Sequence, residues 1–142
     1  MSIKYLNGTI KWHKNKELDK YGKRTLDLYM DQENWDKFKT FDLALKVRTN
    51  EETGEKFITL NRKKIGYNTK GEYELGPWLV VDSADKPYDG EVWNGSQVMV
   101  KLDVYYSKTS GSNVARVEGV RVENLAEAPN LREPDEEIER PF

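Results

Sequence analysis

The sequence lacks several of the groups on which common enzymes depend. It contains no cysteine, which excludes disulfides, thiolate nucleophiles and cysteine metal ligands. The one histidine, His13, cannot form a histidine metal site alone, and a serine–histidine triad would have to be built around it. Neither glycine-rich phosphate motif, G-x-x-x-x-G-K-[ST] or G-x-G-x-x-G, occurs. These absences predict a protein that is not an enzyme and that uses no metal or cofactor.

Long hydrophobic runs are missing as well. No stretch approaches the roughly 20 apolar residues that a membrane-spanning helix needs. The first residues, Met-Ser-Ile-Lys-Tyr, lack the apolar centre of a signal peptide. We therefore expect a soluble intracellular protein without a membrane partner. The length of 142 residues, with no internal repeat, predicts a single domain.

The net charge of −2 conceals a division between two parts of the chain. Residues 127–142 hold six acids, two bases and three of the five prolines, whereas residues 1–126 hold 21 bases and 19 acids. Few apolar residues remain in the acidic part to pack against anything. We therefore interpret residues 1–126 as the folded domain and residues 127–142 as a disordered acidic tail.

The acidic tail stops on an aromatic residue, Phe142. An acidic strand with one hydrophobic anchor can imitate a nucleic-acid backbone, or it can dock in a basic-rimmed apolar pocket of another protein. The alternative is a solvated terminus without a role, as most such tails are. The tail residues that we predict to bind a partner are Asp135, Glu136, Glu137, Glu139 and Phe142.

Alternation of apolar and polar residues predicts strands over residues 9–14, 23–30, 56–62 and 97–106. In a last strand over 114–122 the alternation breaks at Gly119, which is typical of a bulge or a barrel bend. The positions that we expect to face outward include Thr9, Lys11, His13, Asp27, Tyr29, Phe57, Lys101 and Tyr105. Those that we expect to share an inner face include Ile10 with Trp12, then Leu26, Leu28, Ile58, Leu60 and, on the strongest strand, Val98 to Tyr106.

One helix is expected between the second and third long strands. Asp31 can cap it, and Trp35, Phe38, Phe41 and Leu45 recur at helical spacing, so the helix should run to about Leu45. Gly54 supplies a hairpin turn, and residues 67–77 look irregular. Five or six strands with one helix favour a mainly β fold, a five-stranded oligonucleotide/oligosaccharide-binding (OB) barrel that is closed or partly open, over a sandwich.

Basic and aromatic residues are interleaved along the predicted strands. Single-stranded nucleic acids are held in this way, because unpaired bases stack on aromatic rings while phosphates attract cations. His13, among lysines, is then a surface or DNA-facing residue rather than a general base. The residues that we predict to contact DNA are Lys11, Trp12, Lys14, Lys16, Lys23, Arg24, Lys56, Phe57, Arg62, Lys63, Lys64, Tyr67, Trp78, Trp93, Lys101 and Tyr105.

The aromatic residues in this set differ in how far the sequence decides their role. For Trp12, which we expect on the same strand face as Ile10, the sequence favours core packing and base stacking equally. Outward positions favour stacking for Phe57 and Tyr105, and nothing decides for Trp78 and Trp93.

Two other functions compete with nucleic-acid binding. The first is a non-catalytic β-module, such as a virion component, that binds carbohydrate or protein with Trp78 and Trp93 as its platform. The second is a metal-dependent nuclease that uses acids of residues 82–91. Because Pro87 and Gly90 lie among these acids and are typical of turns, we expect the acids to be solvated loop residues instead. These acids are Asp82, Asp85, Asp89 and Glu91.

Residues 76–106 resemble bacteriophage single-stranded DNA-binding proteins of the T-odd podophage type. The pattern is Gly76-Pro-Trp-Leu-Val-Val-Asp82, then Asp89-Gly, then Asn94-Gly-Ser leading into Val98-Met-Val-Lys-Leu-Asp-Val-Tyr105. Residues 117–125 and the acidic tail with its terminal aromatic residue are similar to that family's closing strand and tail. Trp93 departs from the pattern, since a glycine is expected before Asn-Gly-Ser.

The resemblance implies an OB barrel that coats single-stranded DNA during phage replication, recombination and repair, in the cytoplasm of an infected bacterium. It further implies a tail that contacts phage or host replication proteins, such as the polymerase and the helicase-primase, and an association into homodimers. The tail's charge suggests a mechanism in which it competes for the DNA-binding face and is released when DNA occupies that face.

Overall fold

The computed structural model describes residues 2–15, 18 and 22–127, and within these ranges the side chains of 67 and 68 are left out. It contains nine strands and one helix in these residues. The strands are β1 (Ser2–Lys14), β2 (Lys23–Tyr29), β3 (Arg48–Thr49), β4 (Lys56–Lys63), β5 (Ile65–Asn68), β6 (Gly71–Glu74), β7 (Leu79–Val81), β8 (Ser96–Ser107) and β9 (Ser112–Asn124), and the helix is α1 (Gln32–Thr40).

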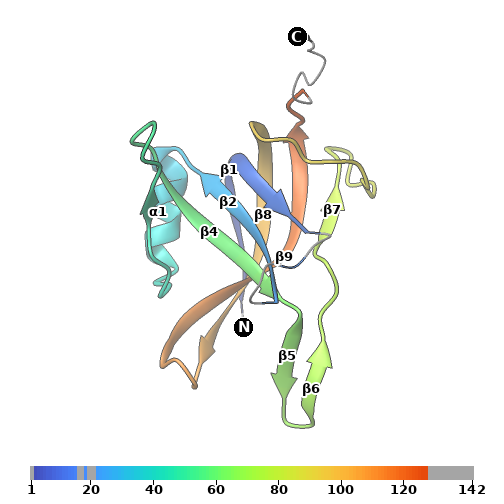
Figure 1. The fold of residues 1–142 in the computed structure, drawn as a ribbon. Coiled ribbons are helices and arrows are strands. Elements are labelled where there is room, and N and C mark those ends of the chain that lie inside the picture. The colour runs from blue at the N-terminus through green and yellow to red at the C-terminus, as the bar shows by residue number, and fades with distance from the viewer. Residues whose placement is uncertain (1, 16–17, 19–21, 128–142) are drawn as a thin grey trace, which may run out of the picture.

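Five long strands form the main sheet in the order β4-β2-β1-β8-β9, with the short strands β3 and β7 at its two edges. The sheet curls into a barrel (Figure 1). β4 and β9 come together without pairing, so the barrel is not closed by backbone hydrogen bonds. This arrangement confirms the prediction of a mainly β, OB-like fold with one helix.

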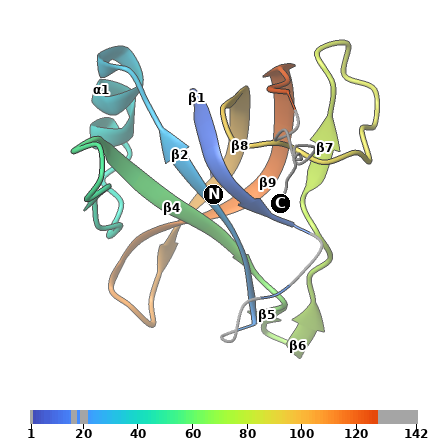
Figure 2. The same cartoon turned by 45° about the horizontal axis from the view of Figure 1, so that its top comes forward.

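β1 is one continuous strand that serves both halves of the barrel. Its first part pairs with β8, from Ser2 to Ile10, and its last part pairs with β2. Figure 2 shows the strand passing between the two halves. At Gly8 a side chain would overlap the carbonyl oxygen of Tyr29, so the close approach of β1 to β2 requires glycine there. The strand therefore begins earlier than the predicted range of 9–14 and runs through Asn7-Gly8 without a turn.

The core fills the barrel interior with the inward residues of the five long strands. Alternation therefore predicted most of the core correctly. Phe38 of α1 and Trp78, before β7, are buried against the same cluster. The hydrophobic side chains with at most 2% exposure are Leu6, Ile10, Leu26, Leu28, Ile58, Leu60, Val98, Val100, Leu102, Val117 and Val120.

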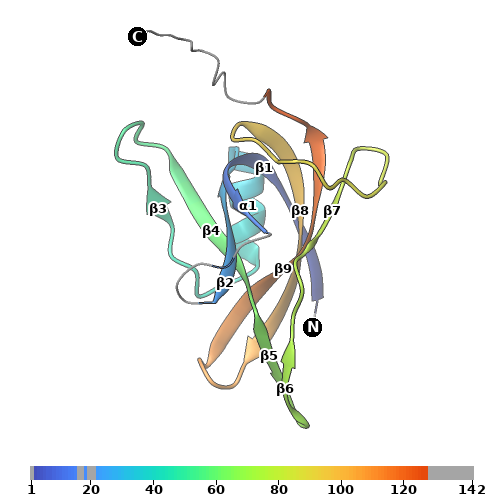
Figure 3. The same ribbon diagram turned by 45° about the vertical axis from the view of Figure 1, so that its right-hand side comes forward.

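The helix begins where the sequence predicts and ends earlier. The Asp31 side chain accepts a hydrogen bond from the backbone N–H of Asn34, which is an N-cap. The helix stops at Thr40, and Asp42 adopts a positive φ of 52°. Phe41 and Leu45 still pack against the core, because the chain turns back along the barrel. α1 therefore covers one side of the barrel, as Figure 3 shows behind β1 and β2.

The remaining hairpins confirm some sequence predictions and correct others. Gly54, with φ 76°, forms the expected β3–β4 turn, and the pairing of β8 with β9 shifts register beside Gly119, as the broken alternation predicted. The irregular stretch expected over 67–77 is instead mostly the β5–β6 hairpin. β5–β6 and the β8–β9 hairpin project from the same end of the barrel (Figures 1 and 3). Among the described residues, no helix is long and apolar enough to cross a membrane.

Candidate nucleic-acid interface

A β-bulge in β1 exposes Trp12. The pairing of β1 with β2 shifts between Ile10 and Trp12, so that Ile10 faces the core while Trp12 stands opposite Asp27 on the outer surface. Trp12 is 43% exposed. Its indole N–H donates a hydrogen bond to Thr25 Oγ1 across 3.0 Å, which fixes the ring. The expectation that Trp12 shares a face with Ile10 is therefore wrong, and the ring is a preformed flat surface open to solvent.

The same bulge turns His13 inward, which corrects its interpretation as a DNA-facing residue. Opposite Leu26, His13 packs edge-on against Trp78 with ring centroids 5.3 Å apart. The indole N–H of Trp78 donates to His13 Nε2 across 3.1 Å. Burial lowers the pKa of His13 from 6.5 to about 4. His13 is thus a neutral hydrogen-bond acceptor in the wall of the barrel.

Trp78 is a core residue and cannot serve as a ligand platform. It is 3% exposed. Its backbone N–H donates to Asn15 Oδ1 across 2.9 Å, and its carbonyl accepts from Asn15 Nδ2 across 2.8 Å. The predicted contact of Trp78 with DNA is therefore corrected. The same burial removes one of the two rings that the carbohydrate-binding or protein-binding alternative needs.

A hollow of about 560 Å³ opens beside Trp12 on the outer face of β1, β2 and β4. Tyr29 and Phe57 form its floor, stacked at 4.9 Å between centroids with an angle of 21°. Phe57 is only 8% exposed, so its predicted outward side chain is covered by Tyr29 and by Arg48, whose guanidinium carbon lies 5.5 Å from the Phe57 ring. The hollow is lined by Lys11, Trp12, Asp27, Tyr29, Thr49, Asn50, Phe57, Asn94 and Gly95.

Lysine ammonium groups lie near these rings, and one of them, that of Lys11, is paired with the carboxylate of Glu55. Lys11 Nζ lies 4.4 Å from the Tyr29 ring and 2.8 Å from Glu55 Oε1. The hydrogen bond and the charge of Lys11 lower the pKa of Glu55. Lys14 Nζ lies 5.2 Å from the Trp12 ring. The site therefore combines one exposed ring, that of Trp12, with ammonium groups, and one of these groups is already paired with a carboxylate.

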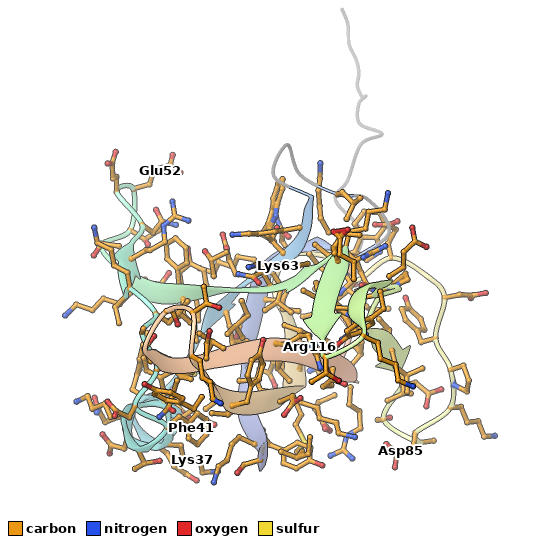
Figure 4. All side chains as sticks on the ribbon, turned by 90° about the horizontal axis from the view of Figure 1, so that it is seen from below. Lys37, Phe41, Glu52, Lys63, Asp85 and Arg116 are labelled. Carbon is orange, nitrogen blue, oxygen red and sulfur yellow. The ribbon has the colours of Figure 1, made fainter. Side chains whose placement is uncertain are left out.

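A second hollow, of about 740 Å³, lies where β4, the β5–β6 hairpin and the β8–β9 hairpin meet. Lys63 and Arg116 both line it, and Figure 4 views the molecule from this end. Asp27 lines the first hollow and Thr59 the second, and the Thr59 hydroxyl donates to Asp27 Oδ1 across 2.7 Å. This one hydrogen-bonded pair therefore lies between the two hollows.

Tyrosines surround the second hollow. Tyr105 faces outward as predicted, with the Arg116 guanidinium carbon 5.8 Å from its ring. Tyr106, which the alternation placed inside, is 63% exposed because it lies near the end of the hairpin, where the barrel no longer covers its face. Tyr73 of β6 is 38% exposed. Neither Tyr73 nor Tyr106 is among the residues predicted to contact DNA, because Tyr73 lies in a stretch that looks irregular and Tyr106 follows the alternation of the core valines of β8.

Arg62 and Arg24 hold the barrel together rather than face a ligand. Arg62 donates to the carbonyls of Gly76, across 2.7 Å, and Val117, across 3.1 Å, and to Glu118 Oε2, across 3.0 Å. Arg24 Nη1 donates to the Leu75 carbonyl across 3.1 Å. Both arginines share the inner face of their strands with core leucines, which explains their inward direction. Their interpretation as exposed DNA-binding cations is therefore corrected.

The other predicted cations are distributed over several surfaces. Lys14, Lys56, Lys63 and Lys64 are exposed, and Lys23 is half-buried opposite Lys63. Lys101 is exposed on β8 opposite Tyr5 of β1, and it lines neither hollow. Of the predicted cations, Lys14 is therefore exposed on β1, and Lys56 and Lys63 are exposed on β4.

Three other predictions concern a turn and the undescribed parts of the chain. Trp93 is half-buried in the turn before β8, where its carbonyl accepts from the N–H and the hydroxyl of Ser96. Lys16, the Tyr67 side chain and the tail residues Asp135, Glu136, Glu137, Glu139 and Phe142 lie outside the described residues.

The loop acids of the nuclease alternative have structural partners. Asp82 accepts from the backbone N–H groups of Ala84 and Lys86, and Asp85 pairs with Arg121 across 3.4 Å. Within residues 2–15, 18 and 22–127, no group of three histidine, aspartate or glutamate side chains could hold a metal ion. Asp82 and Asp85 therefore have structural partners in and around the loop between β7 and β8.

The strand order and the position of the helix define a partly open, OB-like barrel. The chain is similar to gp2.5, a single-stranded DNA-binding protein encoded by bacteriophage T7, with a TM-score of 0.64, 16% identity, and coverage of 97% of this chain and 95% of that one. It is also similar to the single-stranded DNA-binding protein of bacteriophage Enc34 in complex with single-stranded DNA, with a TM-score of 0.57, 12% identity, and coverage of 87% and 86%.

A C-terminally truncated form of the Enc34 protein matches with a TM-score of 0.56 and 12% identity, over 86% of this chain and 84% of that one. At these identities the likeness establishes the fold. No family model matches the sequence, and no curated protein matches it.

Proposed function

We propose that residues 1–126 form a domain that binds single-stranded DNA largely without sequence preference and acts in phage DNA replication, recombination and repair. The observation that carries this proposal is the ring of Trp12, which is open to solvent, fixed by Thr25 and flanked by Lys14. It stands beside a hollow with an aromatic floor on a fold that solved single-stranded DNA-binding proteins share.

The geometry supports a division of labour between stacking and charge. A base placed on Trp12 exchanges water for an aromatic surface, an interaction worth roughly 1–3 kcal/mol per base. The ammonium groups of Lys14 on β1 and of Lys56 and Lys63 on β4 are exposed and can neutralise phosphates. Because a rigid duplex hides the flat faces of its bases, a face built around an open ring favours single strands.

We further propose that the acidic tail, residues 127–142, competes with DNA for this face and recruits replication proteins, such as a polymerase or a helicase-primase, through Asp135, Glu136, Glu137, Glu139 and Phe142. The four net negative charges of the tail support the competition. Deletion of residues 127–142 should tighten DNA binding, most strongly at low salt, because competing charges are screened as salt rises. Equal affinity with and without the tail would contradict the competition.

The resemblance to the phage family also leads us to propose a homodimer in the cytoplasm of the infected bacterium. Light scattering of the full chain tests the dimer, and a mass that stays at one chain across concentration would contradict it.

Tryptophan fluorescence tests the central proposal. A single strand of about 16 nucleotides, the upper site size of one OB barrel, should quench the fluorescence more than the matching duplex does. Affinity should fall with salt at a log–log slope of about −0.7 per neutralised phosphate. Replacing Trp12 by phenylalanine should remove most of the quenching. The matched control is Trp35→Phe, because Trp35 packs edge-on against Phe38 on α1 and lines neither hollow. No binding at low salt would refute the proposal.

A further inference from the structure

An acidic side chain stands in the middle of the proposed DNA-binding face. Asp27 lies opposite Trp12 in the β1–β2 register, and both side chains line the 560 Å³ hollow. A carboxylate in this place repels phosphates, so it lowers the general affinity for DNA. Its position between an exposed ring and an aromatic floor is the position that the edge of a stacked base would occupy.

The hydrogen bonds around Asp27 orient the carboxylate and leave part of it open. Arg48 Nη1 donates to Thr59 Oγ1 across 3.1 Å, and the Thr59 hydroxyl donates to Asp27 Oδ1 across 2.7 Å. Among the described residues no hydrogen bond reaches Asp27 Oδ2. Burial raises the pKa of Asp27, while Thr59 and the charge of Arg48 lower it, so this carboxylate is partly desolvated and gains from a donor.

Two other polar side chains of the hollow, Asn50 and Lys11, already have partners. The Asn50 amide nitrogen donates to the Tyr29 hydroxyl across 3.0 Å, and Asn50 Oδ1 accepts from the backbone N–H groups of Glu52 and Thr53. Lys11 is paired with Glu55. Asp27 differs from them as a carboxylate that Thr59 orients and whose second oxygen accepts no hydrogen bond from the described residues.

We propose that this hollow is a base-selective subsite, in which a nucleobase stacks on Trp12 and donates its exocyclic amino group to Asp27. This inference rests on the proposed function and adds a chemical preference at one nucleotide position. A carboxylate accepts a hydrogen bond from the amino group of cytosine. Uracil and thymine have an oxygen at C4 instead, which is itself an acceptor and cannot donate to the carboxylate. The volume of about 560 Å³ lies within the ~300–1,000 Å³ of small-molecule sites. At this position cytosine, which presents its amino group, is therefore preferred over thymine and uracil, which present an oxygen there.

Two oligonucleotides that differ at the base edge alone test the proposal. Oligodeoxycytidylate and oligodeoxyuridylate of equal length carry equal phosphate charge, and neither has the thymine methyl group. Their binding to the full chain is measured by competition against a labelled strand at low salt and neutral pH. We expect the cytidylate to bind about fivefold more tightly, the low end of what a good base-edge contact contributes.

The variant Asp27→Asn is close to isosteric and identifies the group responsible. Its amide can donate to uracil O4 as well as accept from cytosine, and it removes a negative charge. We expect the cytidylate preference to fall to about one while neither affinity decreases. Asn94→Ala, a change of another polar residue of the same hollow, is the matched control and should keep the preference.

Each outcome bears on a different claim. Equal affinities in the unaltered protein would overturn the subsite, and this comparison needs no variant to fold. A preference that persists in Asp27→Asn would overturn the role of Asp27. Failure of the unaltered protein to bind either oligonucleotide would refute DNA binding itself, which separates the two proposals.

Discussion

The indole N–H of Trp78 donates a hydrogen bond to Nε2 of His13, so this nitrogen must stay unprotonated in the folded protein. The folded-state pKa of His13 is about 4, against 6.5 for an exposed histidine. The unfolded chain therefore binds more protons between these values, and stability is lost as pH falls from about 6.5 to about 4. The expected loss attributable to His13 is about 2 kcal/mol at pH 5.

The pH effect can be measured by urea unfolding at about pH 7.5 and pH 5, with His13→Gln as the comparison. Glutamine offers an oxygen to the Trp78 indole and does not titrate. The stability difference between the protein and this variant should change with pH by about 2 kcal/mol, because their other titrating groups are shared. An unchanged difference would mean that His13 protonates without disturbing the fold.

Arg62 and Lys63 are neighbours on β4, and we expect the first to contribute to stability and the second to DNA binding. Arg62→Met removes three hydrogen bonds that join β4 to residue 76 and β9, so we expect a loss of about 2–4 kcal/mol in unfolding free energy. Lys63→Met, at an exposed position, should change stability by less than about 0.5 kcal/mol.

The two variants should behave in the opposite way toward DNA. Lys63→Met should weaken binding and reduce the salt slope by about 0.7, the value for one phosphate. Arg62→Met, assayed at a temperature where it is folded, should retain the slope. If Arg62→Met stays stable and its salt slope falls by about 0.7, then Arg62 contacts a phosphate, as the sequence predicted.

The pairing of Lys11 with Glu55 predicts a gain of DNA affinity when the acid is neutralised. In Glu55→Gln the Lys11 ammonium is free to meet a phosphate. Because exposed ion pairs are weak, affinity should rise modestly, by up to about fivefold, at low salt. Glu52→Gln is the matched control, because Glu52 lies in the same turn and forms no ion pair among the described residues. Equal gains in both variants would reveal a general charge effect instead of a specific exchange.

We expect alanine to destabilise the protein at Gly8 and to be tolerated at Gly66. At Gly8 the added carbon would overlap the backbone oxygen of Tyr29, which cannot move without disturbing the β1–β2 pairing. We expect Gly8→Ala to cost about 1–3 kcal/mol or more. At Gly66 the added carbon meets the far end of the Tyr73 side chain, which can rotate away. Thermal unfolding of both variants measures the contrast, and similar midpoints would contradict it.

The sequence predicted the parts of the fold that follow from local periodicity. Alternation placed Leu26, Ile58 and Leu102 in the core, and Asp31 marked the start of the helix, because these signals are carried by a few neighbouring residues. The helix end was wrong, since Phe41 and Leu45 reach the core from a non-helical segment that helical spacing cannot distinguish.

The candidate site was harder to predict, because it depends on pairings between distant segments. Nothing local in Lys11-Trp12-His13 reveals which residue is the extra one, so Trp12 and His13 were assigned to the wrong faces. Likewise, the partners of Arg62 lie in β9 and near residue 76, far away in the sequence. A long-range partner decides whether an arginine on a strand is a ligand contact or a structural bridge.

The β-bulge at the end of β1 also shows which residue of this segment the register does not need. Lys11 is the extra residue, since Ile10 pairs with Leu28 and the next pair is Trp12 with Asp27. Loss of Lys11 would leave a regular ladder in which Ile10 still faces the core and Trp12 still faces outward, because side chains alternate along a strand. Such a deletion would therefore remove the ammonium group beside Tyr29 while it keeps the direction of the indole.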